Sequence, residues 1–241
     1  MKRFWTVATA TPVDAGWQVL LDRRAVKTQA GSAQVVPTPA LAAALADEWA
    51  AQGATVDPAS LPLRDLTDLA IDVIAADRAG STAALLRYAE TDTLCYRAEP
   101  EEALHIRQIE LWEPLLVAAE ARWQVQFERV NGVIHRPQRP ATLARLEREL
   151  AAHDPFTLAA LTTLSALAAS LTIALAALEP GADAAGLWDA ANLEEDWQAE
   201  LWGTDAEAAE RRARRLAAFS AAQRFAWLAR SQSSPRSRQQ A

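Results

Sequence analysis

Two kinds of hydrophobic pattern divide the chain near residue 38. Before it, Trp5–Thr9 and Trp17–Leu21 are short runs rich in aromatic and β-branched residues, separated by the turn residues Asp14–Gly16. Strand-forming runs on either side of such a turn predict a hairpin. Ala25–Thr28 and Gln34–Pro37, which flank another turn, predict a second hairpin. The N-terminal part is therefore predicted to be an antiparallel β unit of about four strands.

Helical signals begin at Thr38, an expected N-cap, and Pro39, an expected first helical residue. Gly53 is expected to end this helix after Gln52. Further helices are predicted over 63–77, from Ser81, from Pro100 with a kink or an end at Pro114, over 141–152, from Asp154, over 184–202, and from Thr204 with Glu207 completing a capping box. One late hairpin is predicted over residues 124–136, around an Asn-Gly pair.

The segment 156–178 contains no charged residue and is long enough to cross a bilayer. Its flanks are Asp154 and Glu179 rather than clusters of Lys and Arg, and about half of its residues are Ala, Ser or Thr. Such small residues gain little from hydrocarbon but let helices approach one another closely. We therefore predict a helix buried in the centre of a bundle and no stable membrane insertion.

Composition favours more helix than sheet. Of the 241 residues, 56 are Ala and only 8 are Gly, and Ala has the highest helix propensity. The predicted fold class is α+β, with a small antiparallel β-rich N-terminal domain followed by a larger, mostly α-helical domain. We predict a β-rich domain with one helix over residues 1–60, the helical domain over 61–230, and a disordered tail over 231–241.

Charge is unevenly distributed, although the net charge is only −7. No acidic residue follows Glu210, and residues 211–241 contain eight arginines. A basic end of this kind suits a nucleic acid or an acidic partner bound through Arg211–Arg238, or contacts with the acidic body of the same chain. We favour the intramolecular interpretation and expect no nucleic-acid partner.

Signatures of catalysis are few. The eight glycines do not cluster, so no loop can bind a phosphate through consecutive backbone amides. His105, His135 and His153 each lack a second His or a Cys three or four residues away. The one cysteine, Cys95, has no nearby His and is expected to be a buried structural residue. We predict no cofactor, no metal and no catalytic residue.

The acidic stripe Asp65, Asp68 and Asp72 is the main candidate for a metal site, which would contradict that prediction. Spacings of three and four residues place the three carboxylates on one side of a helix. Such a stripe could hold Mg²⁺ against a diphosphate, so a magnesium-dependent helical enzyme is the alternative function. The stripe lacks an adjacent Asp-Asp pair, and a solvated helix face opposite Leu66, Leu69 and Val73 explains it as well.

A second acidic cluster, Glu194 to Asp196, lies beside tryptophans. Adjacent acids on a helix point in different directions, so they cannot act as a close catalytic pair. Acids beside aromatic residues suit a surface on which aromatic area supplies affinity and charge supplies orientation. An amphipathic helix with its tryptophans in the core is the other interpretation. The predicted partner-binding residues are Glu194, Glu195, Trp197 and Trp202.

Short matches spread over residues 2–228 point to one family. In chain order they include Lys2-Arg3-Phe4-Trp5, Leu21–Thr28, Val36-Pro37-Thr38, Glu48-Trp49, Leu61-Pro62-Leu63, Ala70-Ile71-Asp72, Thr91–Ala98, Gln108, Trp112–Leu116, Asp154-Pro155-Phe156 and Trp202-Gly203. Together, and in this order, they make the chain similar to the assembly chaperones that bind the alpha subunit of the ATP synthase F(1) catalytic head.

The resemblance implies a β-rich N-terminal domain, a helical second domain and no catalysis. It implies that the protein holds the unassembled alpha subunit and shields the apolar surface that later meets the beta subunit. An orphan subunit exposes an obligate interface, which is an aggregation hazard until it is covered. Because no presequence is visible, a bacterial cytoplasmic location is expected, or the mitochondrial matrix if a presequence is missing.

The resemblance also singles out an acidic position shortly before the Trp-Gly pair, which is important for chaperone action in the family. Glu194 matches this position best, and Glu195 is one residue away. The chain departs from the family pattern at Glu113, where Asp is common, and at Asn192–Glu194, where an Asp-Glu pair is frequent. The second departure weakens the assignment to one particular residue.

Overall fold

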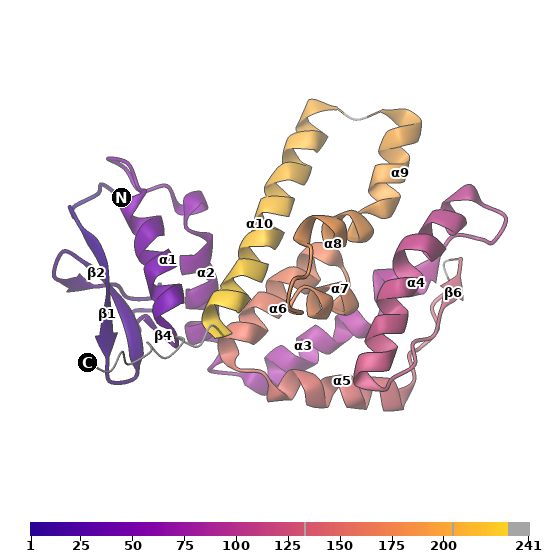
Figure 1. The fold of residues 1–241 in the computed structure, drawn as a ribbon, viewed down its shortest axis with the longest axis horizontal. Helices are drawn as coiled ribbons and strands as arrows, with labels where there is room; N and C mark the ends of the chain where they lie inside the picture. Colours follow the sequence, from indigo (N-terminus) through magenta and orange to yellow (C-terminus); the bar gives the residue numbers. More distant parts are fainter. Residues whose placement is uncertain (133, 204, 231–241) are drawn as a thin grey trace, which may run out of the picture.

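The computed structural model describes residues 1–132, 134–203 and 205–230. It confirms the α+β class, since a small antiparallel sheet lies near the N-terminus and helices form the larger remainder. In Figure 1 the indigo sheet and α1 (Pro39–Ala50) lie at one side of the molecule, and the later helices extend away from them. The tail predicted over 231–241 lies outside the described residues, and the domain boundary near residue 60 stays a prediction.

The sheet is built around β2 (Gly16–Leu21), which pairs with three other strands. β1 (Ala8–Val13) runs antiparallel to β2 over the full length of both strands. β3 (Arg24–Ala25) and β4 (Val35–Val36) also pair antiparallel with β2. Gly16 is required where β2 begins, because its φ is +145° and a Cβ there would lie 2.4 Å from the carbonyl oxygen of Val36.

The strand β1 begins later than predicted. The Asp22 carboxylate accepts hydrogen bonds from the backbone N–H groups of Thr6 (3.0 Å) and Val7 (2.9 Å). These two residues are therefore held beside Asp22 rather than in regular strand pairing. Trp5 is buried, and its ring packs edge-on against that of Trp49 in α1, with 5.3 Å between the ring centroids.

The other two predicted hairpins do not form as expected. The second is reduced to an isolated bridge between Lys27 and Ala33, because β3 and β4 both pair with β2. The hairpin predicted over 124–136 is wrong: β6 (Val130–Asn131) pairs in parallel with β5 (Tyr96–Arg97) instead. The partner strand therefore comes from a segment on the other side of a long helix in the sequence.

The beginning of α1 is as predicted. Pro39 is its first residue, and the Thr38 hydroxyl oxygen accepts a hydrogen bond from the N–H of Leu41 at 3.1 Å. The same hydroxyl donates to the carbonyl oxygen of Leu228 at 2.6 Å, near the end of the last helix. The helix ends at Ala50, slightly before the predicted end.

The segment predicted as one α-helix over 63–77 changes helical type along its length. It consists of α2 (Pro62–Asp68) and a π-helical turn, η2 (Leu69–Ile74). After η2 the N–H of Ala75 donates to the carbonyl oxygen of Ala70 at 3.0 Å, the five-residue spacing of a π-helix. The uniform helix expected here is therefore wrong.

Asp68 and Asp72 join this segment to the β unit. Asp68 accepts hydrogen bonds from the Gln34 side-chain amide (2.6 Å) and the Gln29 N–H (3.2 Å). Asp72 accepts hydrogen bonds from the Thr28 hydroxyl (2.8 Å) and the Ala30 N–H (3.2 Å). Asp68 is only 6% exposed, and burial raises its pKa against the opposing effect of these hydrogen bonds. The solvated face expected for this stripe is therefore wrong for Asp68, whose carboxylate lies at the junction between the β unit and the helices.

The remaining helices form the larger part of the molecule (Figure 1). They are α3 (Arg78–Glu90), α4 (Ala103–Trp123), α5 (Pro140–Ala152), α6 (Pro155–Ala168), α7 (Leu171–Ala176), α8 (Ala184–Ala191), α9 (Leu193–Trp202) and α10 (Ala206–Arg230), with short 3-10 turns η1 (Pro58–Ser60) and η3 (Thr93–Cys95). Their common core includes Trp112, Leu146, Trp188, Phe219 and Phe225.

Helix α6 lies at the centre of the bundle, as the uncharged segment predicts. It contacts α2, η2, α3, α7 and α10, and Leu158, Leu161 and Leu164 are fully buried. The segment is nevertheless two helices: Ala169, at a left-handed φ of +48°, ends α6, and the Ser170 hydroxyl caps α7. Among the described helices, none combines the length and the apolar character needed to span a membrane.

Three predicted helix limits differ from those observed. The cap of α3 is Asp77, whose carboxylate accepts the N–H of Gly80 at 2.8 Å, and the expected cap, Ser81, lies inside the helix. Helix α4 begins at Ala103 and continues through Pro114. The helix predicted over 184–202 is divided into α8 and α9. The predicted cap Thr204 lies outside the described residues.

The junction formed by Asp68 gives a stability prediction. Asp68→Ala should lower the free energy of unfolding by about 1–3 kcal/mol, because it leaves the buried amide of Gln34 and the N–H of Gln29 without an acceptor. Asp65→Ala is the matched control, because Asp65 is exposed and contacts only the neighbouring Arg64, at 3.1 Å. It should change stability by no more than about 0.5 kcal/mol. Urea unfolding of the parent chain and the two variants measures both changes in stability. Equal changes for the two variants would contradict the assigned role of Asp68.

Candidate functional site

Helix α9 is the element that carries the predicted partner-binding residues. Together with the adjoining half of α10 it projects from the body of the molecule (Figure 1). Glu194, Glu195 and Asp196 lie in its first turn, where negative charge is favourable beside the unpaired N–H groups of a helix N-terminus. The charges of Glu195 and Asp196 are thus placed where they help α9 to form.

Contacts with α4 hold one side of α9. The Gln108 side-chain amide donates to the Glu194 carboxylate at 2.8 Å, and Gln108 itself is fully buried. Further along, Arg107 donates to both carboxylate oxygens of Glu200, at 2.9 and 2.7 Å. The Arg107 guanidinium also lies 4.5 Å from the ring centroid of Trp197, a cation–π contact. These contacts account for Trp197 as a residue that positions α9.

Contacts with α10 hold the other side. Arg212 donates to Asp196 at 2.8 and 2.5 Å and to Asp189 of α8 at 3.0 Å. Arg215 lies 3.9 Å from Glu195. These pairs favour the intramolecular interpretation of the Arg-rich end, as do two pairs within α10, Glu207–Arg211 at 3.7 Å and Glu210–Arg214 at 2.6 Å.

The last turn of α9 exposes apolar surface. Trp202 is 80% exposed and Leu201 is 57% exposed. The indole N–H of Trp202 donates to the Gln198 side chain at 2.9 Å, which fixes how the ring is presented. Trp188 is fully buried under Phe219, so it belongs to the core. The interpretation as a core residue therefore holds for Trp188, and the interpretation as an exposed surface residue holds for Trp202.

An acidic groove lies beside the first turn of α9. Its volume is about 800 Å³, and its walls come from α9, the start of α4 and the segment that follows β5. It is lined by Tyr96, Arg97, Ala98, Glu99, Glu102, Leu104, Gly132, Glu194, Glu195 and Gln198. The Arg97 guanidinium is paired with Glu113 at 2.6 Å, so the carboxylates dominate the charge of the groove. We call it the α9 groove.

Glu194 and Glu195 thus line one concave surface, whereas Trp202 lies at the far end of the same helix and is not among the residues that line the groove. Gln108 was noted only as a family match, and the sequence did not indicate that Gln108, Arg107 and Arg212 position α9. Gln108 left one signal: it recurs with Trp112 and Leu116 at four-residue spacing on the buried side of α4. A polar residue on a buried stripe needs a hydrogen-bond partner.

The residues considered for catalysis have structural roles. Cys95 is buried as predicted, and burial raises its pKa. The imidazoles of His105 and His135 contact the Ala98 carbonyl and the Tyr96 hydroxyl respectively, each at 2.9 Å. Within the described residues no group of three His, Cys, Asp or Glu side chains is arranged to hold a metal ion. The Asp stripe therefore gives no support to a magnesium site.

Glu194 gives a prediction with a definite pH dependence. Glu194 is an exposed residue, but partial desolvation of its carboxyl raises its pKa above the unfolded value and outweighs the hydrogen bond from Gln108, so ionisation of this carboxyl weakens the fold as the pH rises. Glu194→Gln keeps an acceptor for Gln108 and removes that penalty. Its melting temperature should exceed that of the parent chain by an amount that grows from about pH 4.5 to about pH 7.

Differential scanning calorimetry across this range measures the effect. Glu195→Gln is the matched control, because it removes an adjacent carboxylate whose Arg215 partner is 3.9 Å away. The melting temperature of the control should follow that of the parent. A lower melting temperature for Glu194→Gln at neutral pH would contradict the assignment.

Comparison with known proteins identifies the family. The family model described as ATP12 chaperone protein matches residues 2–120. The crystal structure of Atp12 from Paracoccus denitrificans and that of a Lys-for-Asp mutant of the protein are each 38% identical to the chain, with a TM-score of 0.89 over 95% of this chain and 98% of theirs. The Atu1473 protein of Agrobacterium tumefaciens is 40% identical, with a TM-score of 0.89 over 93% of this chain and 85% of its own. The chain therefore belongs to the ATP12 chaperone family.

Proposed function

We propose that this protein binds the unassembled alpha subunit of the ATP synthase F(1) sector and shields the surface that later contacts the beta subunit. Membership in the ATP12 family makes the chain a chaperone of ATP synthase assembly. The identity of the client and the binding surface on this chain are our proposal. So is a bacterial cytoplasmic location, which is supported by relatives from two bacteria.

The observation that carries the proposed surface is an exposed aromatic anchor at the end of a firmly held helix. Trp202 and Leu201 expose most of their surface to solvent. A large ring that is already held in place loses little conformational entropy on binding. Such aromatic anchors contribute disproportionately to the affinity of protein interfaces.

Charge gives this surface an orientation. Glu194 and Glu195 line the α9 groove at the start of the helix, and Trp202 lies about 12 Å further along, at 1.5 Å per residue. We infer that a client surface with a basic group and an apolar pocket at this separation fits both features. Charge at the rim of an interface mainly speeds association, and the apolar anchor slows dissociation. A complex of this type can release its client when the beta subunit arrives.

Co-expression with the alpha subunit of the same organism, in the absence of beta, tests the client. Size-exclusion chromatography should show a stoichiometric complex that dissolves when beta is added. Insoluble alpha with no co-eluting complex would overturn the proposal.

Variants of α9 test the surface. Glu194→Lys reverses a groove charge, and Trp202→Ala removes the anchor; each should weaken alpha binding at least about tenfold. Glu147→Lys is the matched charge control, because Glu147 is exposed on α5, outside α9 and the α9 groove. It should bind like the parent chain. Far-ultraviolet circular dichroism and melting curves establish that each variant is folded, and undiminished binding by folded Glu194→Lys and Trp202→Ala would exclude α9 as the surface.

A further inference from the structure

A second concave site lies at the opposite end of α4 from the α9 groove. Its volume is about 530 Å³, and it is lined by Arg122, Trp123, Glu149, His153, Leu175, Leu178, Glu179, Pro180, Gly181, Trp227 and Arg230. Leu104 lines the α9 groove and Arg122 lines this cavity, so a helical rise of about 27 Å separates the two sites. We call it the α4–α10 cavity.

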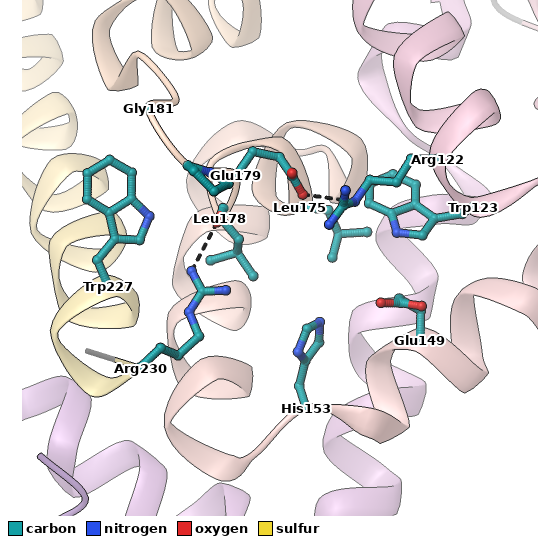
Figure 2. A pocket seen from close by; sticks show the side chains of 11 residues that line it. Arg122, Trp123, Glu149, His153, Leu175, Leu178, Glu179, Gly181, Trp227 and Arg230 are labelled. Atoms are coloured by element: carbon teal, nitrogen blue, oxygen red, sulfur yellow. Dashed lines mark hydrogen bonds and ion pairs between the residues drawn. The ribbon is translucent and has the colours of Figure 1, made fainter. Parts of the chain in front are cut away.

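The inner surface of the cavity is apolar. Leu175, Leu178 and Trp123 are each less than 10% exposed. In Figure 2, Trp227 and Arg230 lie at one end and Arg122 and Trp123 at the other, with the two leucines between them. A volume of this size, with an apolar inner wall and polar side chains around it, is typical of sites for small molecules or peptide ends.

Most of the charges around the cavity are compensated within the protein. Arg122 pairs with Glu179 at 2.9 Å, and Glu149 pairs with Arg145 at 3.1 Å. These pairs leave little net charge at one side of the cavity.

Arg230 differs from these paired residues in the groups that it contacts. Its guanidinium donates to the carbonyl oxygens of Ala226 (3.1 Å) and Leu178 (3.0 Å) and forms no ion pair with any described residue. Two carbonyl groups orient a guanidinium without neutralising it. Arg230 is an exposed residue, and the partial desolvation of its guanidinium lowers its pKa, with Asp154 and Glu179 opposing this effect; an arginine remains charged at neutral pH.

His153 faces the same space (Figure 2). Burial lowers its pKa, so the imidazole is neutral at pH 7 and adds a hydrogen-bond donor without adding charge. Among the described residues, the cavity thus combines one cation without an ion-pair partner, one neutral donor and apolar walls.

We propose that the α4–α10 cavity binds a monocarboxylate with an apolar or aromatic body, with the carboxylate on Arg230 and the body against Leu175, Leu178 and Trp227. The Arg230 guanidinium supplies charge-assisted hydrogen bonds, and the apolar wall removes the body of the ligand from water. Two sources carry this chemistry, a free organic acid and the C-terminal carboxylate of a peptide. The site is independent of the α9 groove, so the proposal stands or falls separately from the proposed client surface.

Two pairs of probes test the chemistry with the full chain. The first pair is 3-phenylpropionate and its primary amide; the second is the tetrapeptide Gly-Ser-Leu-Phe with a free or an amidated C-terminus. The chain has nine tryptophans, and NMR of their indole N–H groups follows binding, with Trp→Phe variants to assign the signals. The signals of Trp123 and Trp227 should move with each carboxylate, and the amides should bind at least about tenfold more weakly.

Arg230→Gln should weaken both carboxylates by about tenfold or more and leave the amides unaffected. Arg224→Gln is the matched control, because Arg224 is an exposed arginine of the same helix that does not line the cavity. It should bind as the parent does.

The outcomes are distinct. If the peptide with a free C-terminus binds more tightly than 3-phenylpropionate, the source is a protein C-terminus. If 3-phenylpropionate binds as tightly or more tightly, the source is a free acid. Both results support the site. The proposal is overturned if amides bind as tightly as carboxylates, if Trp123 and Trp227 do not respond, or if folded Arg230→Gln binds like the parent. Should Arg230→Gln fail to fold, the comparison of carboxylate with amide in the parent chain decides.

Discussion

The burial of α10 against the centre of the molecule is the interaction on which the rest of the fold depends. Phe219 packs on Trp188 of α8, with 5.7 Å between ring centroids, and Phe225 packs on Phe156 of α6 at 6.1 Å. The same helix also contacts α1 and α2, so one element joins the β unit, the central helix and the segment that carries α9. The buried residues of α10 begin at Phe219, and the preceding half of the helix, which projects from the body, holds α9 from the side through Arg212 and Arg215.

This arrangement explains how a short helix can present an aromatic residue to solvent. An isolated helix of ten residues is only marginally stable in water. Here α9 is clamped between Arg107 of α4 and Arg212 of α10, and Gln108 fixes its first turn. The exposed ring of Trp202 is consequently carried by a rigid support, which suits reversible binding of a client through a small number of anchors.

The sequence was sufficient for features that arise locally. Thr38 and Asp154 cap helices as predicted, the first turn lies before Gly16, and the uncharged segment is central. It was insufficient where distant groups compete for a residue. The acids at 68 and 72 have helical spacing but bind donors of the β unit, and β6 pairs with β5 across the whole of α4. The two concave sites are assembled from segments far apart in the chain, so spacing alone could not reveal them.

The hydrogen bond from the Thr38 hydroxyl to Leu228 has a consequence for biosynthesis. It connects the first helix made by the ribosome to the last turn of the last one. Domains commonly fold from the N-terminus as they emerge, but here α1, α2 and α6 all lack part of their covering until α10 has left the exit tunnel. Each of these helices therefore keeps part of its apolar side exposed on the nascent chain from its own synthesis until α10 can pack against it. A member of a chaperone family thus itself passes through a stage in which its own apolar surfaces are unprotected.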